Sequence, residues 1–266
     1  MTNDTPLWHP QEVIGMRWNA DQSPEQARIL ELARDALRFV SATGQRYRFE
    51  DFCKSLGSSA PPRIPGTLEP SQDPLEERLR RTADFFTKAR DEEADSAKEK
   101  ELIQVVLDTL RFIASTGQHR AFGEYLEHLE ANAPPYAIAS FDTRDAAEAW
   151  LGNHPNPPTS ANVLIANDYH DVFYDRETNF RRLHRNRDLE YYLGELAHEE
   201  PFAATESFAS REEAETWLRA QPEPARWTWV SISGEPYLAV YHPNIGHRAL
   251  YPLSMARAYE PEPEEP

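Results

Sequence analysis

Apolar residues in the N-terminal half of the chain recur every three or four positions in two separate segments, 30–40 and 103–113. Residues with this spacing lie on one face of a helix. A shorter run with the same spacing follows each segment, at 49–56 and at 122–129. The pattern therefore predicts four amphipathic helices arranged as two consecutive pairs.

The two pairs are copies of one another. Residues 35–62 fall on residues 108–135 without a gap when they are shifted by 73 positions. Gly44 and Gly117 follow the first helix of each copy, at the place where a left-handed residue ends a helix and where glycine is preferred. We expect two helix–turn–helix hairpins, at about 24–62 and 97–135.

The C-terminal half carries a second duplication, with a period of 67. Residues 140–183 map without a gap onto 207–250, and fourteen of the forty-four aligned positions hold the same residue. In the first copy, apolar and β-branched runs at 136–141, 162–166 and 169–174 favour strands, and 143–153 favours a helix. Asn167-Asp168 marks a hairpin turn. The second copy repeats these elements at 202–208, 210–220, 227–233 and 237–241, with a turn at 233–236.

These patterns predict an α+β fold with two domains. The first domain, residues 1–135, contains two tandem helical hairpins. The second domain, residues 136–258, contains two tandem βαββ units, at about 136–185 and 202–254, whose strands form one or more antiparallel sheets. A helix containing Leu189, Leu193 and Leu196 joins the two units. Residues 57–74, which are rich in proline, are expected to be an extended loop, and 91–101 a charged helical face or connector. The acidic tail, 259–266, is expected to be disordered.

Charge narrows the classes of partner. The 266 residues carry a formal net charge of −17, from 45 acidic and 28 basic side chains. Such a field repels nucleic acid and anionic lipid, and it attracts a cationic protein, although excess acidity also serves solubility. The second helices of the hairpins, RFEDFCKSL and AFGEYLEHL, lack the basic and amide face that reads DNA. We therefore expect no binding to nucleic acid.

The remaining composition favours a cytoplasmic protein without a membrane span. The N-terminus has no signal-peptide pattern, and no apolar run is long enough to cross a bilayer. Cys53 is the single cysteine, so no disulfide can form within the chain. Its counterpart in the other copy is Leu126, which indicates a packing residue rather than a nucleophile.

No motif indicates catalysis or a cofactor. A phosphate-binding loop, a dinucleotide fingerprint and a nucleophile elbow are all missing from the sequence. The nine histidines lack the compact spacing of a zinc site, and His154, His170, His184 and His198 read as a scattered surface set. We expect no catalytic residue, no metal and no cofactor.

One basic cluster interrupts the acidic C-terminal half, and it consists of Arg176, Arg181, Arg182, His184, Arg185 and Arg187. It could hold a phosphate or an acidic peptide. The favoured interpretation is pairing with nearby carboxylates, namely Asp171, Asp175, Glu177 and Asp188.

Aromatic residues rimmed by carboxylates on the βαββ units form the candidate surface for a partner, because rings supply contact area at small entropic cost. The alternative is that these rings fill the core. The candidate residues are Asp168, Tyr169, Asp171, Asp175, Trp227, Trp229, Glu235 and Tyr237.

The segments LRFIASTGQHRAFGEYL and FASREEAETWL…WVSISGEPYLAVYH…RALYPLS resemble myxobacterial proteins of poorly assigned function, including immunity proteins of polymorphic toxins. The likeness runs from about residue 27 to 254 and rests on packing and capping residues. It implies a cytoplasmic protein that neutralises a cognate toxin by binding, and the chain's acidity suggests that the toxin is basic. Two alternatives stay open: a scaffold that binds a peptide through the hairpin face around Phe49 and Phe122, and a hydrolase whose cleft holds perturbed titratable groups.

Overall fold

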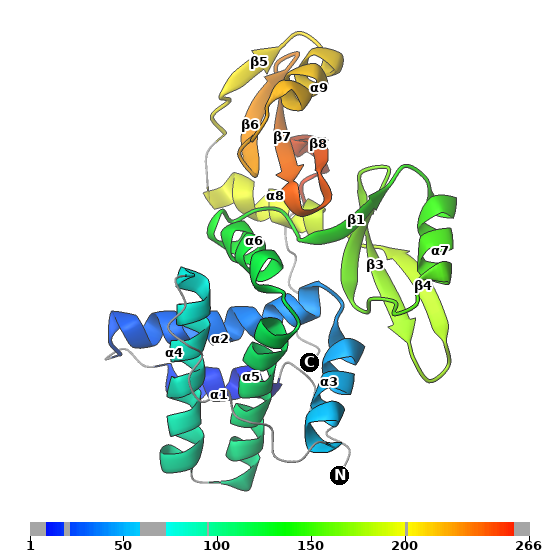
Figure 1. Ribbon diagram of the computed structural model, residues 1–266. Helices are drawn as coiled ribbons and strands as arrows, with labels where there is room; N and C mark the ends of the chain where they lie inside the picture. Colours follow the sequence, from blue (N-terminus) through cyan, green and yellow to red (C-terminus); the bar gives the residue numbers. More distant parts are fainter. Residues whose placement is uncertain (1–8, 19–21, 59–72, 95, 200–201, 258–266) are drawn as a thin grey trace, which may run out of the picture. The chain divides into compact units, whose positions relative to one another are not determined.

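The computed structural model describes residues 9–18, 22–58, 73–94, 96–199 and 202–257. It has the expected α+β composition, with helices in the N-terminal part and two four-stranded sheets in the C-terminal part (Figure 1). The chain divides into two compact units. The first contains 1–126 with Asn156–Ser160, and the second contains Glu127–Pro155 with 161–266. We expected the division near residue 135. The chain instead passes from the first unit to the second after residue 126, within the helix His119–Glu130.

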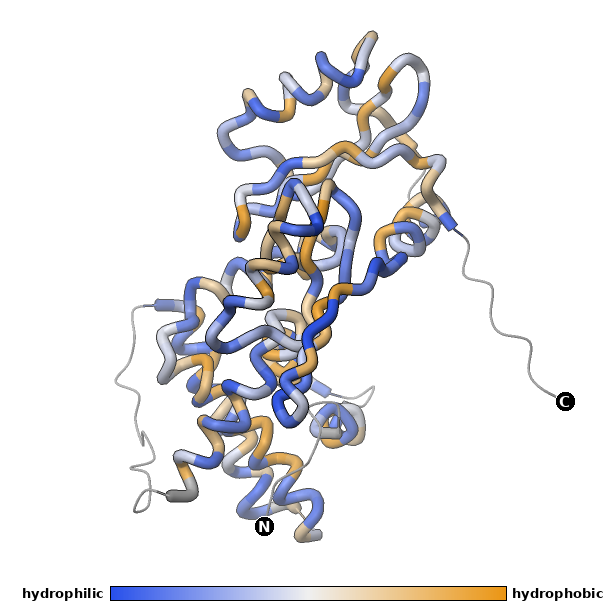
Figure 2. Tube along the Cα trace, turned by 90° about the vertical axis from the view of Figure 1, so that its right-hand side faces the viewer, coloured by the Kyte–Doolittle hydropathy of each residue, from blue (hydrophilic) through white to orange (hydrophobic). Residues whose placement is uncertain are grey.

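The first unit is helical, and apolar residues recur among polar ones along most of its helices, as packing of one helix face requires (Figure 2). Both expected hairpins are present. The first consists of α2 and α3, and the second consists of α5 and α6. The helices of this part of the chain are α1 (His9–Arg17), α2 (Pro24–Ala42), α3 (Arg46–Ser58), α4 (Pro74–Lys88), the π-helical segment η1 (Ala89–Glu93), α5 (Ala97–Ser115) and α6 (His119–Glu130).

The turn of each hairpin has the geometry that its glycine predicts. Gly44 and Gly117 have φ values of 65° and 69°. The amide of the following residue returns to the last turn of the helix, from Gln45 to the Val40 carbonyl at 2.9 Å and from Gln118 to the Ile113 carbonyl at 3.1 Å. This bond is the signature of a Schellman motif, so both helices end in the same way.

The two hairpins pack against one another through reciprocal aromatic contacts. The ring centroids of Phe39 and Phe122 are 5.3 Å apart, and those of their counterparts Phe112 and Phe49 are 5.7 Å apart. Each phenylalanine of a first helix therefore contacts the second helix of the other copy. All four rings are buried. Rings at these distances gain edge-to-face attraction as well as burial.

A hydrogen bond between equivalent residues continues this arrangement. The Gln45 side chain donates from Nε2 to Oε1 of Gln118 at 2.7 Å, and these residues are 73 positions apart, which is the period of the repeat. Each glutamine also bonds to the threonine two residues before it, Thr43 or Thr116. The contact between the copies thus joins identical positions.

Two helices of this unit were not expected. The region left unassigned after the proline-rich segment forms α4, which Asp73 caps through a bond from the Leu75 amide to its carboxylate at 2.8 Å. Pro74 at the first helical position and buried Leu79 and Phe86 were available signals. α1 has little amphipathic character to reveal it. The loop expected at 57–74 and the tail at 259–266 lie outside the described residues, except at 57–58 and 73–74, which belong to or cap helices.

The second unit contains the end of α6 and two sheets, with one short helix on a face of each (Figure 1). The first sheet has the strand order β1-β2-β3-β4 and carries α7, and the second has the order β5-β6-β7-β8 and carries α9. The elements are β1 (Ala137–Phe141), α7 (Arg144–Asn153), β2 (Ala161–Ile165), β3 (Asp168–Asp175), β4 (Phe180–Arg185), α8 (Asp188–Glu199), β5 (Glu206–Phe208), α9 (Arg211–Ala220), β6 (Trp227–Ile232), β7 (Glu235–His242), η2 (Pro243–Ile245), β8 (His247–Pro252) and η3 (Leu253–Met255).

Each copy is larger than the βαββ unit that we expected, because a further strand completes it. β4 and β8 pair antiparallel with β3 and β7. The sequence of β4, FRRLHR, hides its alternation, since Leu183 is its only buried side chain. The sheets are also mixed rather than antiparallel throughout. β1 runs parallel to β2, and β5 to β6, because a helix connects each pair and returns the chain to the same end.

The layer between each sheet and its helix is built from the same positions in both copies. Six buried residues form it in the first copy, and the six residues 67 positions later form it in the second. The first set is Ala147, Leu151, Val163, Ile165, Val172 and Leu183, and the second is Ala214, Leu218, Val230, Ile232, Ala239 and Leu250. The period found in the sequence is therefore the period of a core.

The hairpin turns also coincide, one residue earlier than expected in the first copy. Ala166 and Asn167 have φ values of 48° and 72°, and Ser233 and Gly234 have 53° and 85°. Positive φ at both central residues defines a type I′ turn, which matches the twist of the flanking strands. The first turn is thus Ala166-Asn167, and Asp168 already belongs to β3.

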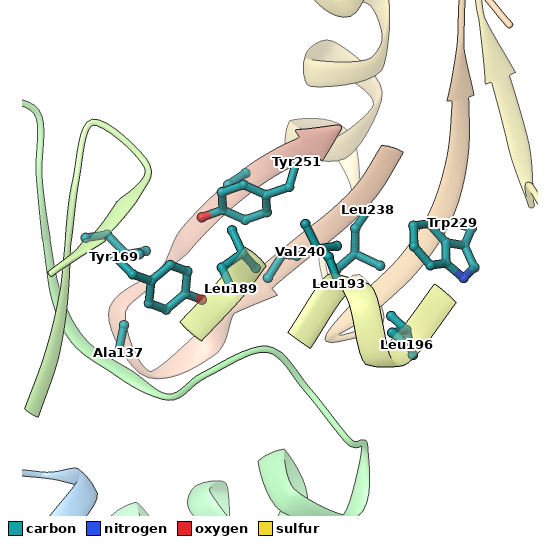
Figure 3. Packing of buried hydrophobic residues seen from close by; sticks show 11 residues of the cluster. Ala137, Tyr169, Leu189, Leu193, Leu196, Trp229, Leu238, Val240 and Tyr251 are labelled. Carbon is teal, nitrogen blue, oxygen red and sulfur yellow. The ribbon is translucent and has the colours of Figure 1, made fainter. Parts of the chain in front are cut away.

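α8 lies between the copies and packs chiefly on the second sheet. Leu189, Leu193 and Leu196 of this helix, which we expected to join the units, are buried (Figure 3). They share one cluster with Ala137, Leu164 and Tyr169 of the first sheet and with Trp229, Leu238, Val240, Ala249 and Tyr251 of the second. The two sheets are separate. α8 covers one face of the second sheet.

The equivalent glycines of the hairpins give a controlled test of the turn. A Cβ at Gly44 would lie 2.5 Å from the Pro158 Cβ and 2.8 Å from the Thr159 amide nitrogen, whereas a Cβ at Gly117 meets nothing within 4 Å. Both substitutions to alanine incur the left-handed strain, of about 1 kcal/mol. We expect Gly44→Ala to lower the free energy of unfolding by about 1–3 kcal/mol more than Gly117→Ala, in urea titrations followed by circular dichroism. Equal losses would contradict the close packing of 158–159 on this turn.

Candidate functional site: the exposed Phe173–Phe180 surface

The aromatic residues expected to form a partner surface are mostly interior. Tyr169 and Trp229 are 2% and 4% exposed, so they fill the core, as the alternative interpretation held. Trp227 is half-buried and donates from Nε1 to the Ala131 carbonyl at 2.8 Å. Tyr237 packs against the core beneath α9. These four rings serve the packing of the second unit.

Of the carboxylates named with them, Asp171 and Asp175 lie on the same face of β3, whereas Asp168 and Glu235 do not share that face. The Asp168 carboxylate lies 3.4 Å from a guanidinium nitrogen of Arg185, and that of Asp171 accepts a bond from Asn186 at 2.9 Å. Asp175 accepts bonds from the Thr178 hydroxyl and the Glu177 amide, which lower the pKa of its carboxyl group. Glu235 is exposed at the start of β7 in the other copy.

The basic cluster is mostly bonded within the chain, but the ion pairs of Arg185 and Arg187 are with Asp168 and Glu190 and not with the carboxylates that we expected. Arg185 and Arg187 approach the buried carboxylate of Glu190 at 3.6 and 3.8 Å. Arg181 donates to the Leu151 carbonyl at the end of α7 at 2.7 Å. Arg182 and His184, in contrast, are exposed, and neither forms an ion pair or side-chain hydrogen bond with another described residue.

A buried cluster of histidine and tyrosine rings lies elsewhere in this unit, and no pattern in the sequence had indicated it. The Tyr169 hydroxyl and His242 Nε2 are 3.0 Å apart, which links the two copies. The ring of His242 stacks on that of His128 at 6.4 Å between centroids and lies 6.5 Å from that of His247. His242 is 0% and His128 is 4% exposed.

Burial shifts the proton affinities of this cluster. Desolvation, together with the charge of nearby Arg226, lowers the pKa of His128 to about 4. Desolvation and the neighbouring charges of His128, His247 and Arg226 lower the pKa of His242 to about 3. Desolvation also raises the pKa of Tyr169 well above its usual value. All three side chains are therefore neutral near pH 7.

A hydrolase was expected to show perturbed titratable groups of this kind. Whether these groups could catalyse a reaction depends on whether substrate can reach them. Catalysis requires a group that substrate can reach, and the rings of His128, His242 and Tyr169 are enclosed by their neighbours. Nδ1 of His242 has no hydrogen-bond partner among the described residues. We interpret the cluster as packing that holds the two copies together.

The structure also bears on a metal site, on Cys53 as a nucleophile and on the peptide-binding alternative. Among the described residues, no group of histidine, cysteine and carboxylate side chains could hold a metal ion. Partial burial raises the pKa of the Cys53 thiol to about 12, which opposes formation of a nucleophilic thiolate. Phe49 and Phe122, named for the peptide-binding alternative, are buried between the two hairpins. That face is therefore occupied from within the first unit.

Two exposed aromatic residues of the second unit lie together on the β3–β4 hairpin, and two others, Tyr191 of α8 and Phe202 before β5, are exposed elsewhere. Phe173 and Phe180 are 47% and 49% exposed, and their ring centroids are 5.9 Å apart. Phe173 stands opposite Arg182 across the strands, and Asp175 stands opposite Phe180. Because Val172 points toward α7, the side chains of these partners point to the other face. We call Phe173, Asp175, Phe180, Arg182 and His184 the Phe173–Phe180 surface.

This surface joins apolar area to Arg182, a cation without an ion-pair partner among the described residues. Phe180 and Asp175 also line an open hollow with Gly152 of α7 and with Thr178, Asn179 and Arg181 of the hairpin. Such a combination can bind an apolar side chain and a carboxylate together. The sequence indicated the strand position of Phe173, but it did not reveal β4, which holds Phe180, and it could not show which face of the sheet stays uncovered.

No protein-family model, curated protein or solved structure matches the chain. Within the described part of the chain, no helix has the length and apolar character to cross a membrane.

The buried histidines predict a loss of stability in mild acid. The unfolded chain takes up these protons near pH 6.5, and the folded chain only near pH 4 and pH 3. Between these values the unfolded chain binds more protons, so the free energy of unfolding falls as the pH falls, by about 1.4 kcal/mol per pH unit for each histidine. Replacing His242 by Phe should remove one such contribution between pH 6 and 4.5, measured by urea titration at several pH values.

The matched control is His198→Gln, because His198 is exposed on α8. This variant should keep the slope of the wild-type chain. If His242→Phe and the wild type have the same slope between pH 6 and 4.5, His242 is not held neutral by its surroundings.

Proposed function

We propose that this protein acts by binding another protein and not by turnover, in the manner of an immunity protein that covers a cognate toxin. The observation that carries the proposal is the pair of phenylalanine rings, Phe173 and Phe180, exposed side by side on the β3–β4 hairpin. Clustered aromatic rings with an adjacent arginine are the composition of binding hot spots. Isolated exposed apolar residues would need no such explanation.

The scaffold supports a binding role because it holds this surface on paired strands. β3 and β4 are joined by six register pairs, from His170 with Arg185 to Asp175 with Phe180. Their other face is fixed by Val172 and Leu183 under α7. A surface carried on strands packed in this way changes little on binding, which limits the entropic cost of association.

The charge of the chain bears on the rate of encounter more than on the contact itself. A net charge of −17 attracts a partner of positive net charge over a distance of about 8–10 Å at physiological salt. We therefore propose a basic toxin as the partner and the cytoplasm as the place of action. The local contact at the Phe173–Phe180 surface is apolar, and Arg182 provides its cation.

A competition assay tests the function directly. The gene is deleted in the strain that carries it, and the deletion strain is grown in contact with its parent. We expect survival of the deletion strain to fall at least ten-fold, and expression of the wild-type chain to restore it. Equal survival of the two strains would overturn the proposal.

The proposed basic partner gives a second measurement, made with the purified complex. Electrostatic steering predicts that the association rate constant falls by about ten-fold or more as salt rises from 50 to 500 mM, while the dissociation rate changes little. An association rate that does not change with salt would exclude steering by the acidic chain.

A further inference from the structure

The sheets of the two copies are buried alike on one face but differently on the other. The second copy therefore shows what can cover the face that is exposed in the first. Beneath α7 and α9, the same six positions are buried in each copy. On the opposite face of the second sheet, Val240 is 0% exposed. Its counterpart 67 positions earlier is Phe173, which is 47% exposed.

The element that covers the face in the second copy is a helix. α8 presents Leu189, Leu193 and Leu196, spaced at i, i+4 and i+7, to a cluster that includes Leu238 and Val240 (Figure 3). In the first sheet, the same cluster reaches Leu164 and Tyr169 but does not include Phe173 or Phe180. One end of this face is thus buried by the chain, and the other end is left exposed.

We propose that the Phe173–Phe180 surface binds an amphipathic helix of the partner protein, with an apolar stripe like that of α8 and a carboxylate beside it. The proposal rests on the proposed function and specifies the segment of the partner that is bound. The chain itself contains the precedent, since a helix occupies the equivalent positions of the second sheet. Apolar residues at i, i+4 and i+7 are the anchors by which helices enter apolar surfaces.

The expectation of a carboxylate on the partner helix follows from the charge of Arg182. Arg182 stands across the strands from Phe173 and forms no ion pair with another described side chain, whereas Arg185 pairs with Asp168 and Glu190. In the second copy, the position of Arg182 is held by Ala249, which is buried. The first copy therefore has a cation where the second has core. A carboxylate next to the apolar stripe would pair with it in a partly desolvated setting.

An extended peptide added to the sheet edge is the main competing occupant, since β4 is an edge strand. Its sequence, FRRLHR, places several charges along that edge, and charged residues are the usual means of preventing strand addition. The helix is favoured because it covers the exposed rings, and a strand paired to the edge does not.

The first experiment uses a synthetic peptide with the α8 sequence, Asp188–Glu199, as the probe. A staple joins positions 194 and 198, away from the leucine stripe, because a free helix of this length is marginal in water. Binding to the full chain is measured by fluorescence anisotropy and by amide chemical shifts. We expect shifts on β3 and β4, and affinity reduced at least ten-fold by the double variant Phe173→Ser/Phe180→Ser.

Two controls make this result specific. Met16→Ser removes an exposed apolar residue of the first unit and should leave binding unchanged. A peptide with its middle leucine, Leu193, changed to Ser should bind at least ten-fold more weakly. Melting temperatures of the variants establish that each is folded before binding is compared.

A charge exchange tests the carboxylate. Arg182→Glu should weaken binding of the acidic peptide at least five-fold. A peptide in which Asp188, Glu195 and Glu199 are replaced by Lys should bind this variant better than it binds the wild-type chain. Shifts confined to the second sheet, equal binding by the double phenylalanine variant, or no preference in the charge exchange would each overturn the proposal.

Failure of this inference can be distinguished from failure of the proposed function. If the double phenylalanine variant still protects cells in the competition assay, binding occurs elsewhere and the inference is wrong while the function stands. If the wild-type chain gives no protection, the function is wrong, whatever the peptide does.

Discussion

A four-stranded sheet has two faces to cover, and each copy of the C-terminal repeat supplies only one helix. This constraint governs the second unit. α7 and α9 each cover one face through six equivalent buried positions. Each sheet has a second face, and α8 is the helix that packs there. Its leucines pack mostly on Leu238, Val240 and other residues of the second sheet. The first sheet is left with a partly covered face, and its composition matches, since Asp171, Arg182 and His184 occur where the second sheet has Leu238, Ala249 and Tyr251.

The contact between the copies is completed by polar groups as well as by leucines. Tyr169 of the first copy meets His242 of the second at 3.0 Å in a buried setting, and Asn244 donates to the Ala137 carbonyl at 2.7 Å. Buried polar groups that find partners in only one arrangement favour that arrangement over its alternatives. These two bonds therefore specify how the copies are placed against each other more than they add to stability.

Much of the fold could be predicted from the sequence because duplication repeats its signals. Gly44 and Gly117 marked both hairpin turns, and the periods of 73 and 67 residues identified equivalent cores. Strand β4 could not be recognised, since Leu183 is its only buried side chain. The candidate site was harder still. Alternation places Phe173 on a definite face of a strand, but only tertiary packing decides whether that face is covered, and for this reason Trp229 was expected outside and lies inside.

The reciprocal contacts of the helical hairpins have a consequence for the dependence of folding on protein concentration. Phe39 packs on Phe122 as Phe112 packs on Phe49, so the joined surfaces are self-complementary in the way of a symmetric dimer. Two separate hairpins would bury these rings only by association, and the pair would come apart on dilution. Carrying both on one chain makes that step intramolecular, at an effective concentration on the order of millimolar. The helical unit therefore keeps its paired arrangement however few copies a cell contains.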